Sequence, residues 1–110
     1  MKTSPTQRTL KYYRDLGYTC AITEHWNQFA KIRQDLFGFC DLVVLGKGET
    51  LCVQATSGAN TSARVTKIKA HANYEIVLGA GWKIVVIGWR KLKVKRGEAR
   101  TVWIEKIEYL

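Results

Sequence analysis

The sequence predicts a single α/β domain in which helices flank a mixed β-sheet. Its 110 residues are the usual size of one domain, and a composition of 46% hydrophobic and 25% charged residues is typical of a globular protein. Helical and strand-like patterns follow one another as an αβββαβ core with a C-terminal β-hairpin extension. The nearly continuous apolar run over 82–89 is typical of a strand covered on both faces and reached by a crossover helix. We therefore expect residues 1–110 to form one domain.

Start and stop signals predict the first helix. Ser4 precedes Pro5 and is followed three positions later by Gln7, a capping-box start with proline at the first helical position. Gly17 ends the apolar stripe that follows. Residues 18–23 then alternate in the way of a strand.

A β-hairpin is predicted in the middle of the chain. Residues 27–35 show no clear period, so we expect an extended or loop connection there. The β-rich runs 37–45 and 51–56 are joined by the turn composition of 46–49, which predicts an antiparallel pair.

The second half is predicted to hold a helix, an internal strand and a second hairpin. The helix begins at a cap formed by Asn60 or Thr61 and ends at Gly79. The internal strand over 82–89 follows. The C-terminal hairpin consists of two alternating runs and the turn between them, at 91–95, 101–109 and 96–98.

Composition and terminal signals also restrict location. Cys20, Cys40 and Cys52 are odd in number, lie in apolar segments and lack CxxC spacing, so all three are predicted to be reduced core residues. The first residues lead directly into a polar helix pattern, and no apolar run approaches membrane-spanning length. We therefore expect a cytoplasmic protein with no membrane partner, in a bacterial or phage-infected host cell.

The central hairpin carries a group of polar residues. Asp41 lies among apolar neighbours, where a charge is costly unless it is paired or bound to a metal ion. Gln54 and Thr56 are two residues apart, so the period of a strand places both on one face. An acid on one strand and two polar groups on its neighbour can therefore converge. The alternative is a structural carboxylate that pairs with a nearby cation such as Arg33.

These residues resemble the core of the PD-(D/E)XK nucleases. Asp41 matches the family's aspartate, whereas Gln54 stands in place of the second acid and Thr56 in place of the lysine. The resemblance covers roughly residues 4–90 and implies a restriction-endonuclease-like fold. In that family the acids bind a divalent ion and the lysine orients the attacking water. The resemblance thus implies that Asp41, Gln54 and Thr56 are catalytic.

Other residues are needed to supply the charge that these replacements remove. Oxygen ligands suit Mg²⁺ or Mn²⁺, so the predicted metal ligands are Asp41, the amide of Gln54 and the backbone carbonyl of Ala55. Glu24, on the same strand face as Ile22, is a further predicted ligand, and Asp35 is another available acid. For the missing lysine, either Lys67 or Lys69 can reach in from the second helix.

The charge balance predicts a polyanionic partner. Eighteen Lys and Arg against nine Asp and Glu give a net charge of +9. The cations of the C-terminal hairpin and of the region near the proposed site are predicted to contact nucleic acid, namely Arg33, Arg64, Lys67, Lys69, Arg90, Lys91, Lys93, Lys95 and Arg96. The alternative for the hairpin cations is a solvated face that protects an edge strand from aggregation.

Taken together, the sequence predicts a metal-dependent nuclease that hydrolyses phosphodiester bonds of DNA, with RNA left open. A chain this short offers little surface for gripping a duplex, so a homodimer is also expected. Two alternatives stay open: a nucleic-acid-binding module on the same fold without catalysis, and a basic interaction protein with an acidic partner.

Overall fold

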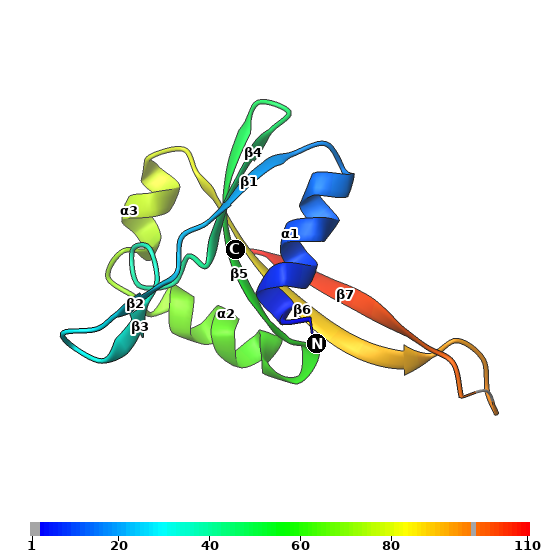
Figure 1. Cartoon of the computed structure of the whole chain (residues 1–110). Coiled ribbons are helices and arrows are strands. Elements are labelled where there is room, and N and C mark those ends of the chain that lie inside the picture. The colour runs from blue at the N-terminus through cyan, green and yellow to red at the C-terminus, as the bar shows by residue number, and fades with distance from the viewer. Residues whose placement is uncertain (1–2, 98) are drawn as a thin grey trace.

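The predicted α/β class with a mixed sheet flanked by helices is confirmed (Figure 1). The computed structural model describes residues 3–97 and 99–110, so residue 98 of the predicted turn and the first two residues lie outside the described part. The elements in chain order are α1 (Pro5–Asp15), β1 (Thr19–Ile22), β2 (His25–Asn27), β3 (Ile32–Gln34), β4 (Leu42–Gly46), β5 (Glu49–Ser57), a short 3₁₀ helix (Gly58–Asn60), α2 (Thr61–Lys69), α3 (Tyr74–Gly79), β6 (Lys83–Lys93) and β7 (Thr101–Tyr109).

Five strands form the main sheet in the order β1-β4-β5-β6-β7. All neighbours pair antiparallel except β5 and β6, which are parallel. A parallel pair needs a long crossover, and α2 and α3 supply it here. Both expected hairpins are present, as β4–β5 and β6–β7.

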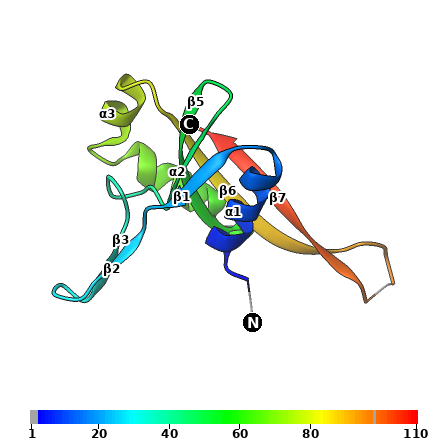
Figure 2. The ribbon, with the colours of Figure 1, turned by 45° about the horizontal axis from the view of Figure 1, so that its top comes forward.

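Strand alternation divides the core into two layers. Leu10 and Tyr13 of α1 pack with Val53 on one face of the sheet. On the other face, Ile68 of α2 and Val77 of α3 pack in a second cluster. Figures 1 and 2 show α1 on one side of the sheet and α2 and α3 on the other. The candidate site lies beside β5, between the start of α1 and α2.

The segment over 27–35, predicted to be an extended or loop connection, is part of a second, two-stranded sheet, β2–β3. Asn27 closes its turn, because the side-chain Oδ1 accepts the backbone N–H groups of Phe29 and Ala30, each at 3.0 Å. Strands of three residues are too short to show a period, which is why the pattern was not visible. The hairpin projects from the body in both views (Figures 1 and 2).

The strand predicted over 37–45 begins only at Leu42. The preceding residues form a tight turn, with Phe37 at φ 58° and Gly38 at φ 91°, and Leu36 bridges to Cys40. Gly38 is required twice over, because its φ is left-handed and a Cβ there would lie 2.4 Å from the His71 ring.

Two further boundaries differ from the prediction. The single helix expected up to Gly79 is two helices, and between them the backbone N–H of Asn73 bonds to His71 Nδ1 at 3.0 Å. This local side-chain bond offers the backbone an alternative to continuing the helix. In contrast, the separate strands predicted over 82–89 and 91–95 are one strand, β6, which pairs along its length with β7.

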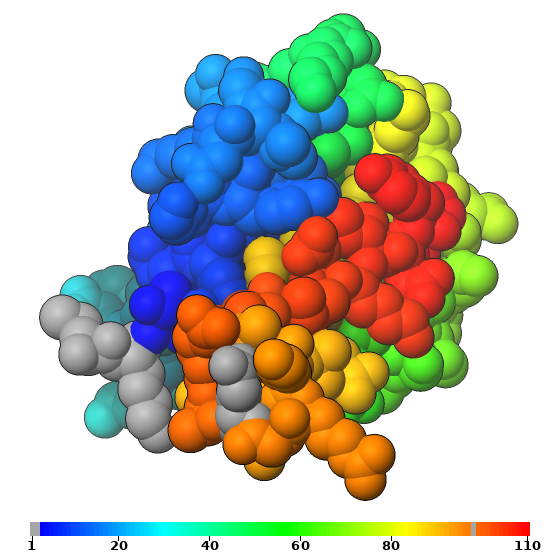
Figure 3. All heavy atoms as spheres, turned by 90° about the vertical axis from the view of Figure 1, so that its right-hand side faces the viewer, coloured from blue at the N-terminus to red at the C-terminus, as the bar shows by residue number. Residues whose placement is uncertain are grey.

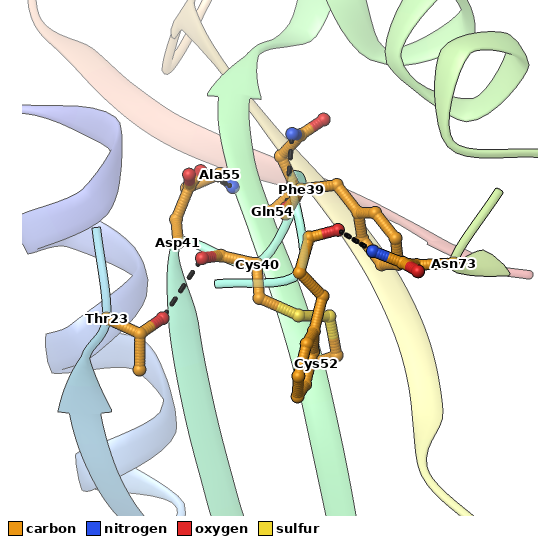
Figure 4. Close-up of a disulfide and its surroundings, with 9 residues drawn as sticks. Thr23, Phe39, Cys40, Asp41, Cys52, Gln54, Ala55 and Asn73 are labelled. Carbon is orange, nitrogen blue, oxygen red and sulfur yellow. Dashed lines mark hydrogen bonds between the residues drawn. A yellow bond between two sulfur atoms is a disulfide. The ribbon is translucent and has the colours of Figure 1, made fainter. Parts of the chain in front are cut away.

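The prediction of three reduced cysteines is wrong for two of them. Cys40 and Cys52 form a disulfide between the turn before β4 and strand β5, whereas Cys20 is free (Figure 4). Structural disulfides are usual in oxidising compartments and uncommon in the cytosol. The bond therefore weighs against the cytoplasmic location, which stays a prediction. Within the described residues, none of the helices has the length and apolar character needed to cross a membrane.

Candidate metal centre

Hydrogen bonds hold the backbone of Asp41 between β5 on one side and the end of β1 on the other. Its N–H donates to the carbonyl of Val53 in β5 at 2.9 Å. Its own carbonyl accepts the N–H groups of Thr23 at 2.8 Å and Glu24 at 3.3 Å, just after β1. These bonds bring the end of β1, the start of β4 and the middle of β5 together.

The side chain of Asp41 also faces β5. Its Oδ2 accepts the backbone N–H of Ala55 at 2.9 Å, and the whole residue is 6% exposed (Figure 4). The hydrogen bond fixes one carboxylate oxygen beside the strand that carries Gln54.

Three carboxylates meet at this point. Oxygen atoms of Glu24, Asp35 and Asp41 all lie within 4.8 Å of one another. The pKa of Asp41 is raised to about 7, chiefly by burial; the hydrogen bond from Ala55 lowers this pKa, and the charges of Asp35 and Glu24 raise it. Acids gathered in this way repel one another unless they share a proton or a cation.

The carboxylates line a cavity of about 280 Å³ that opens between α1, the base of the β2–β3 hairpin and α2. Arg33 Nη1 lies 3.6 Å from Glu24 Oε1, and Thr6 Oγ1 donates to the same oxygen at 3.3 Å. The lining residues are Pro5, Thr6, Glu24, Arg33, Asp35, Asp41, Gln54, Ala55 and Arg64. Acids and cations thus face one space.

Gln54, which lines this cavity, has an unused acceptor. Its Nε2 donates to the carbonyl of Phe39 at 3.2 Å, which fixes the amide. Its Oε1 is buried and finds no hydrogen-bond partner among the described residues. A buried acceptor without a partner is costly, and a cation or a cation-bound water would satisfy it. The three carboxylates are hard oxygen donors of the kind that Mg²⁺, Mn²⁺ or Ca²⁺ accepts, and the amide oxygen of Gln54 is a further candidate on a residue that lines the same cavity.

A second cavity, of about 480 Å³, shares residues with the first and adds a lysine. Asp35, Gln54 and Arg64 line both, so the two spaces adjoin. Lys67 lines the second cavity, in which the turn at Gly38 packs on His71.

The structure brings most of the predicted site residues together. Asp41, Gln54, Ala55 and Glu24 line the first cavity, as does Asp35. Ala55 takes part through its N–H, which bonds to Asp41. Three other predicted residues do not line the first cavity. Thr56 is buried and Lys69 is exposed, and neither lines either cavity. Lys67 lines only the second cavity.

Sequence reasoning did not identify the contribution of α1. Thr6 reaches the cavity because α1 packs across the sheet, and it bonds to a side chain eighteen positions later in the chain. A threonine in the first turn of a helix carries no signal of such a contact.

The predicted cations of the C-terminal hairpin are exposed and form a ridge apart from the acids. They are Arg90, Lys91, Lys93, Lys95 and Arg96. Lys91 lies opposite Trp103 in the β6–β7 register, and the Arg8 guanidinium of α1 lies 3.9 Å from the centre of the Trp103 ring. Figure 3 shows β7 at the surface beside α1, with the hairpin projecting below.

Comparison with models of protein families, with curated proteins and with solved structures gives no match for this chain.

Proposed function

We propose that this protein is a divalent-metal-dependent nuclease that hydrolyses phosphodiester bonds of DNA. The observation that carries the proposal is the meeting of Glu24, Asp35 and Asp41 in a cavity that is also lined by Gln54, whose amide oxygen has no partner among the described residues. The resemblance of Asp41 and of the β4–β5 hairpin to the PD-(D/E)XK core supports the same function. In this chain, acids from outside the motif supply the charge that Gln54 does not.

A divalent ion at this site would polarise the scissile phosphate and lower the pKa of a bound water. The chain's own residues have separate tasks. The three carboxylates would hold the ion, with Gln54 as a further candidate ligand, and the hydrogen bond from Ala55 fixes the orientation of Asp41. Arg33 and Arg64, which line the same cavity, face the growing negative charge of the phosphate. Lys67 in the adjoining cavity adds a third cation.

The overall charge favours a polyanionic substrate. A net charge of +9 attracts nucleic acid, although the centre of the site is acidic. An acidic centre within a basic molecule is the arrangement that a metal-dependent nuclease needs, because the ion reverses the local sign and the surrounding cations hold the phosphates.

Cleavage of labelled DNA tests the proposal. Asp41→Asn keeps an oxygen that can accept the Ala55 N–H but removes the charge, so we expect cleavage in Mg²⁺ or Mn²⁺ to fall by on the order of a hundredfold or more. Asp15→Asn is the matched control, because Asp15 is exposed on α1 and pairs with Lys11. Single-stranded, branched and duplex substrates should all be offered.

Two results would contradict the nuclease. One is cleavage that persists in EDTA, and the other is equal cleavage by wild type and Asp41→Asn. Binding without cleavage in either metal, lost steeply as salt rises, would instead support the second candidate, a binding module without catalysis. That candidate is favoured by the position of Thr56, which brings neither a cation nor a hydroxyl to the two cavities.

A further inference from the structure

The β2–β3 hairpin exposes aromatic side chains beside the acidic cavity. Phe29 at its tip is 93% exposed and Trp26 is 58% exposed. Large aromatic side chains are usually buried, so two of them on one short projecting hairpin are unusual unless something covers them.

The exposed position of Phe29 follows from an ordered turn. Asn27 Oδ1 accepts the N–H groups of Phe29 and Ala30, and Asn27 Nδ2 donates to Gln34 Oε1 at 3.2 Å. Gln34 Oε1 also lies 3.1 Å from His25 Nε2. These polar side chains tie the two strands together on one face of the hairpin, which leaves the other face free.

The free face connects Trp26 to the cavity. Trp26 lies opposite Arg33 in the strand register, and directly opposed residues share a face of an antiparallel pair. Arg33 lines the acidic cavity and lies beside Glu24. Trp26 is two residues from Glu24, or about 7 Å at the rise of a strand. That distance corresponds to at most about two nucleotides, at 3.4 Å for each step of a stacked strand and more for each step of an unstacked one.

The charge of the hairpin selects the partner. Residues 25–34 contain Lys31 and Arg33 and no acid. Aromatic rings next to cations, with no negative charge, suit the faces of nucleobases and the phosphates that join them. Bases expose their faces fully only when they are unpaired and unstacked.

We infer that the β2–β3 hairpin is a stacking platform for unpaired bases, formed by Trp26 and Phe29 with Arg33 at its base. The substrate is then single-stranded or branched DNA that has unpaired nucleotides within about two positions of the cut. This inference rests on the proposed nuclease function, because it places the scissile phosphate at the acidic cavity.

Equilibrium binding in EDTA tests the inference without catalysis. Fluorescence anisotropy should compare a labelled single strand, a forked duplex and a blunt duplex. Trp26→Ala and Phe29→Ala are each expected to weaken binding of the single strand and the fork about 5- to 100-fold. Binding of the blunt duplex should change less than about twofold. Tyr109→Ala is the matched control, since Tyr109 is 68% exposed on β7, away from the hairpin.

Conservative variants separate stacking from a structural role. Trp26→Phe keeps a ring and should retain most of the affinity for the single strand. Phe29→Trp should gain a fluorescence signal that an unlabelled single strand quenches and a blunt duplex does not. Thermal melts should show that all hairpin variants fold like wild type, because both side chains are exposed.

Several outcomes would overturn the inference. They are unchanged affinity of both alanine variants for the single strand, an equal loss on all three DNAs, or no binding to any of them. A loss of binding to anionic lipid vesicles with unchanged DNA affinity would overturn it as well and assign the hairpin to a membrane surface. The cleavage assay with Asp41→Asn is independent, so failure of the stacking platform leaves the nuclease standing. Failure of the nuclease would remove the cut site from the inference and would leave only base stacking, which the binding assay in EDTA measures separately.

Discussion

Asp41 shows how far residue-level reasoning reaches. Its place among apolar neighbours, opposite a strand with Gln54, was predictable because a hairpin and a period of two fix which side chains share a face. The approach of Asp35 was not, because it depends on a turn with two residues of positive φ, Phe37 and Gly38. Glu24 meets the site through the backbone bonds of Asp41, and no pattern in the sequence signals those bonds.

The raised pKa of Asp41 predicts how the metal-free protein responds to pH. Its pKa is 3.8 in a model peptide and about 7 when folded, so the folded state favours the protonated form. The contribution of protonated Asp41 to the stability of the folded protein is fully present below about pH 4 and is lost as the pH rises through 7. In EDTA, Asp41→Asn should therefore melt a few degrees above wild type at pH 8, and the difference should disappear near pH 4.

Melting curves at both pH values check this prediction, with Asp15→Asn as the exposed control. A wild type that is as stable as Asp41→Asn at pH 8 would mean that the buried carboxylate carries no unfavourable charge. The three neighbouring acids would then not destabilise the metal-free protein at pH 8, whereas the account expects them to do so.

At the scale of elements, long periodic segments were predictable and short or tertiary features were not. The apolar run of β6 and the alternation of β7 indicated buried and paired strands, and both are present. The β2 and β3 strands have three residues each, below the length at which a period can be recognised. The end of α2 is set by a local bond between Asn73 and His71 that competes with the helix.

The Cys40–Cys52 disulfide was missed because the sequence shows spacing but not distance. The two residues lie 12 positions apart on segments that become adjacent only when β4 pairs with β5, with a Cα–Cα distance of 5.4 Å. An odd cysteine count is compatible with one bond and one free thiol, here Cys20. Cys40 directly precedes Asp41 in the chain, so the bond ties the turn before Asp41 to β5 (Figure 4).

Reduction is therefore expected to loosen the frame of the site. A reducing agent should lower the free energy of unfolding of wild type by roughly 2–4 kcal/mol, measured by urea denaturation. The Cys20→Ala variant keeps the disulfide, so a reducing agent should lower its free energy of unfolding by the same amount. Thiol titration of the denatured, unreduced protein should find Cys20 alone reactive. If all three cysteines react without reduction, the disulfide is absent and the stability effect should vanish.

The whole molecule combines an acidic centre with basic surroundings. Two hairpins extend from its body in different directions: β2–β3 beside the acids, and the β6–β7 hairpin that carries the cationic ridge (Figures 1 and 2). The net charge of +9 predicted a polyanionic partner from composition alone. Composition could not show that the acids gather at one point, because that depends on three segments, after β1, after β3 and before β4, meeting in three dimensions.

Titration of the metal-free protein with Mn²⁺ at pH 8, followed by calorimetry, tests the central claim most directly. The account predicts binding at one site in wild type and in Asp15→Asn, and affinity at least about tenfold lower in Asp41→Asn. At pH 5 the wild-type affinity should also fall, because Asp41, with a pKa of about 7, is then protonated. Equal Mn²⁺ affinity in wild type and Asp41→Asn, or no binding to wild type, would contradict the account.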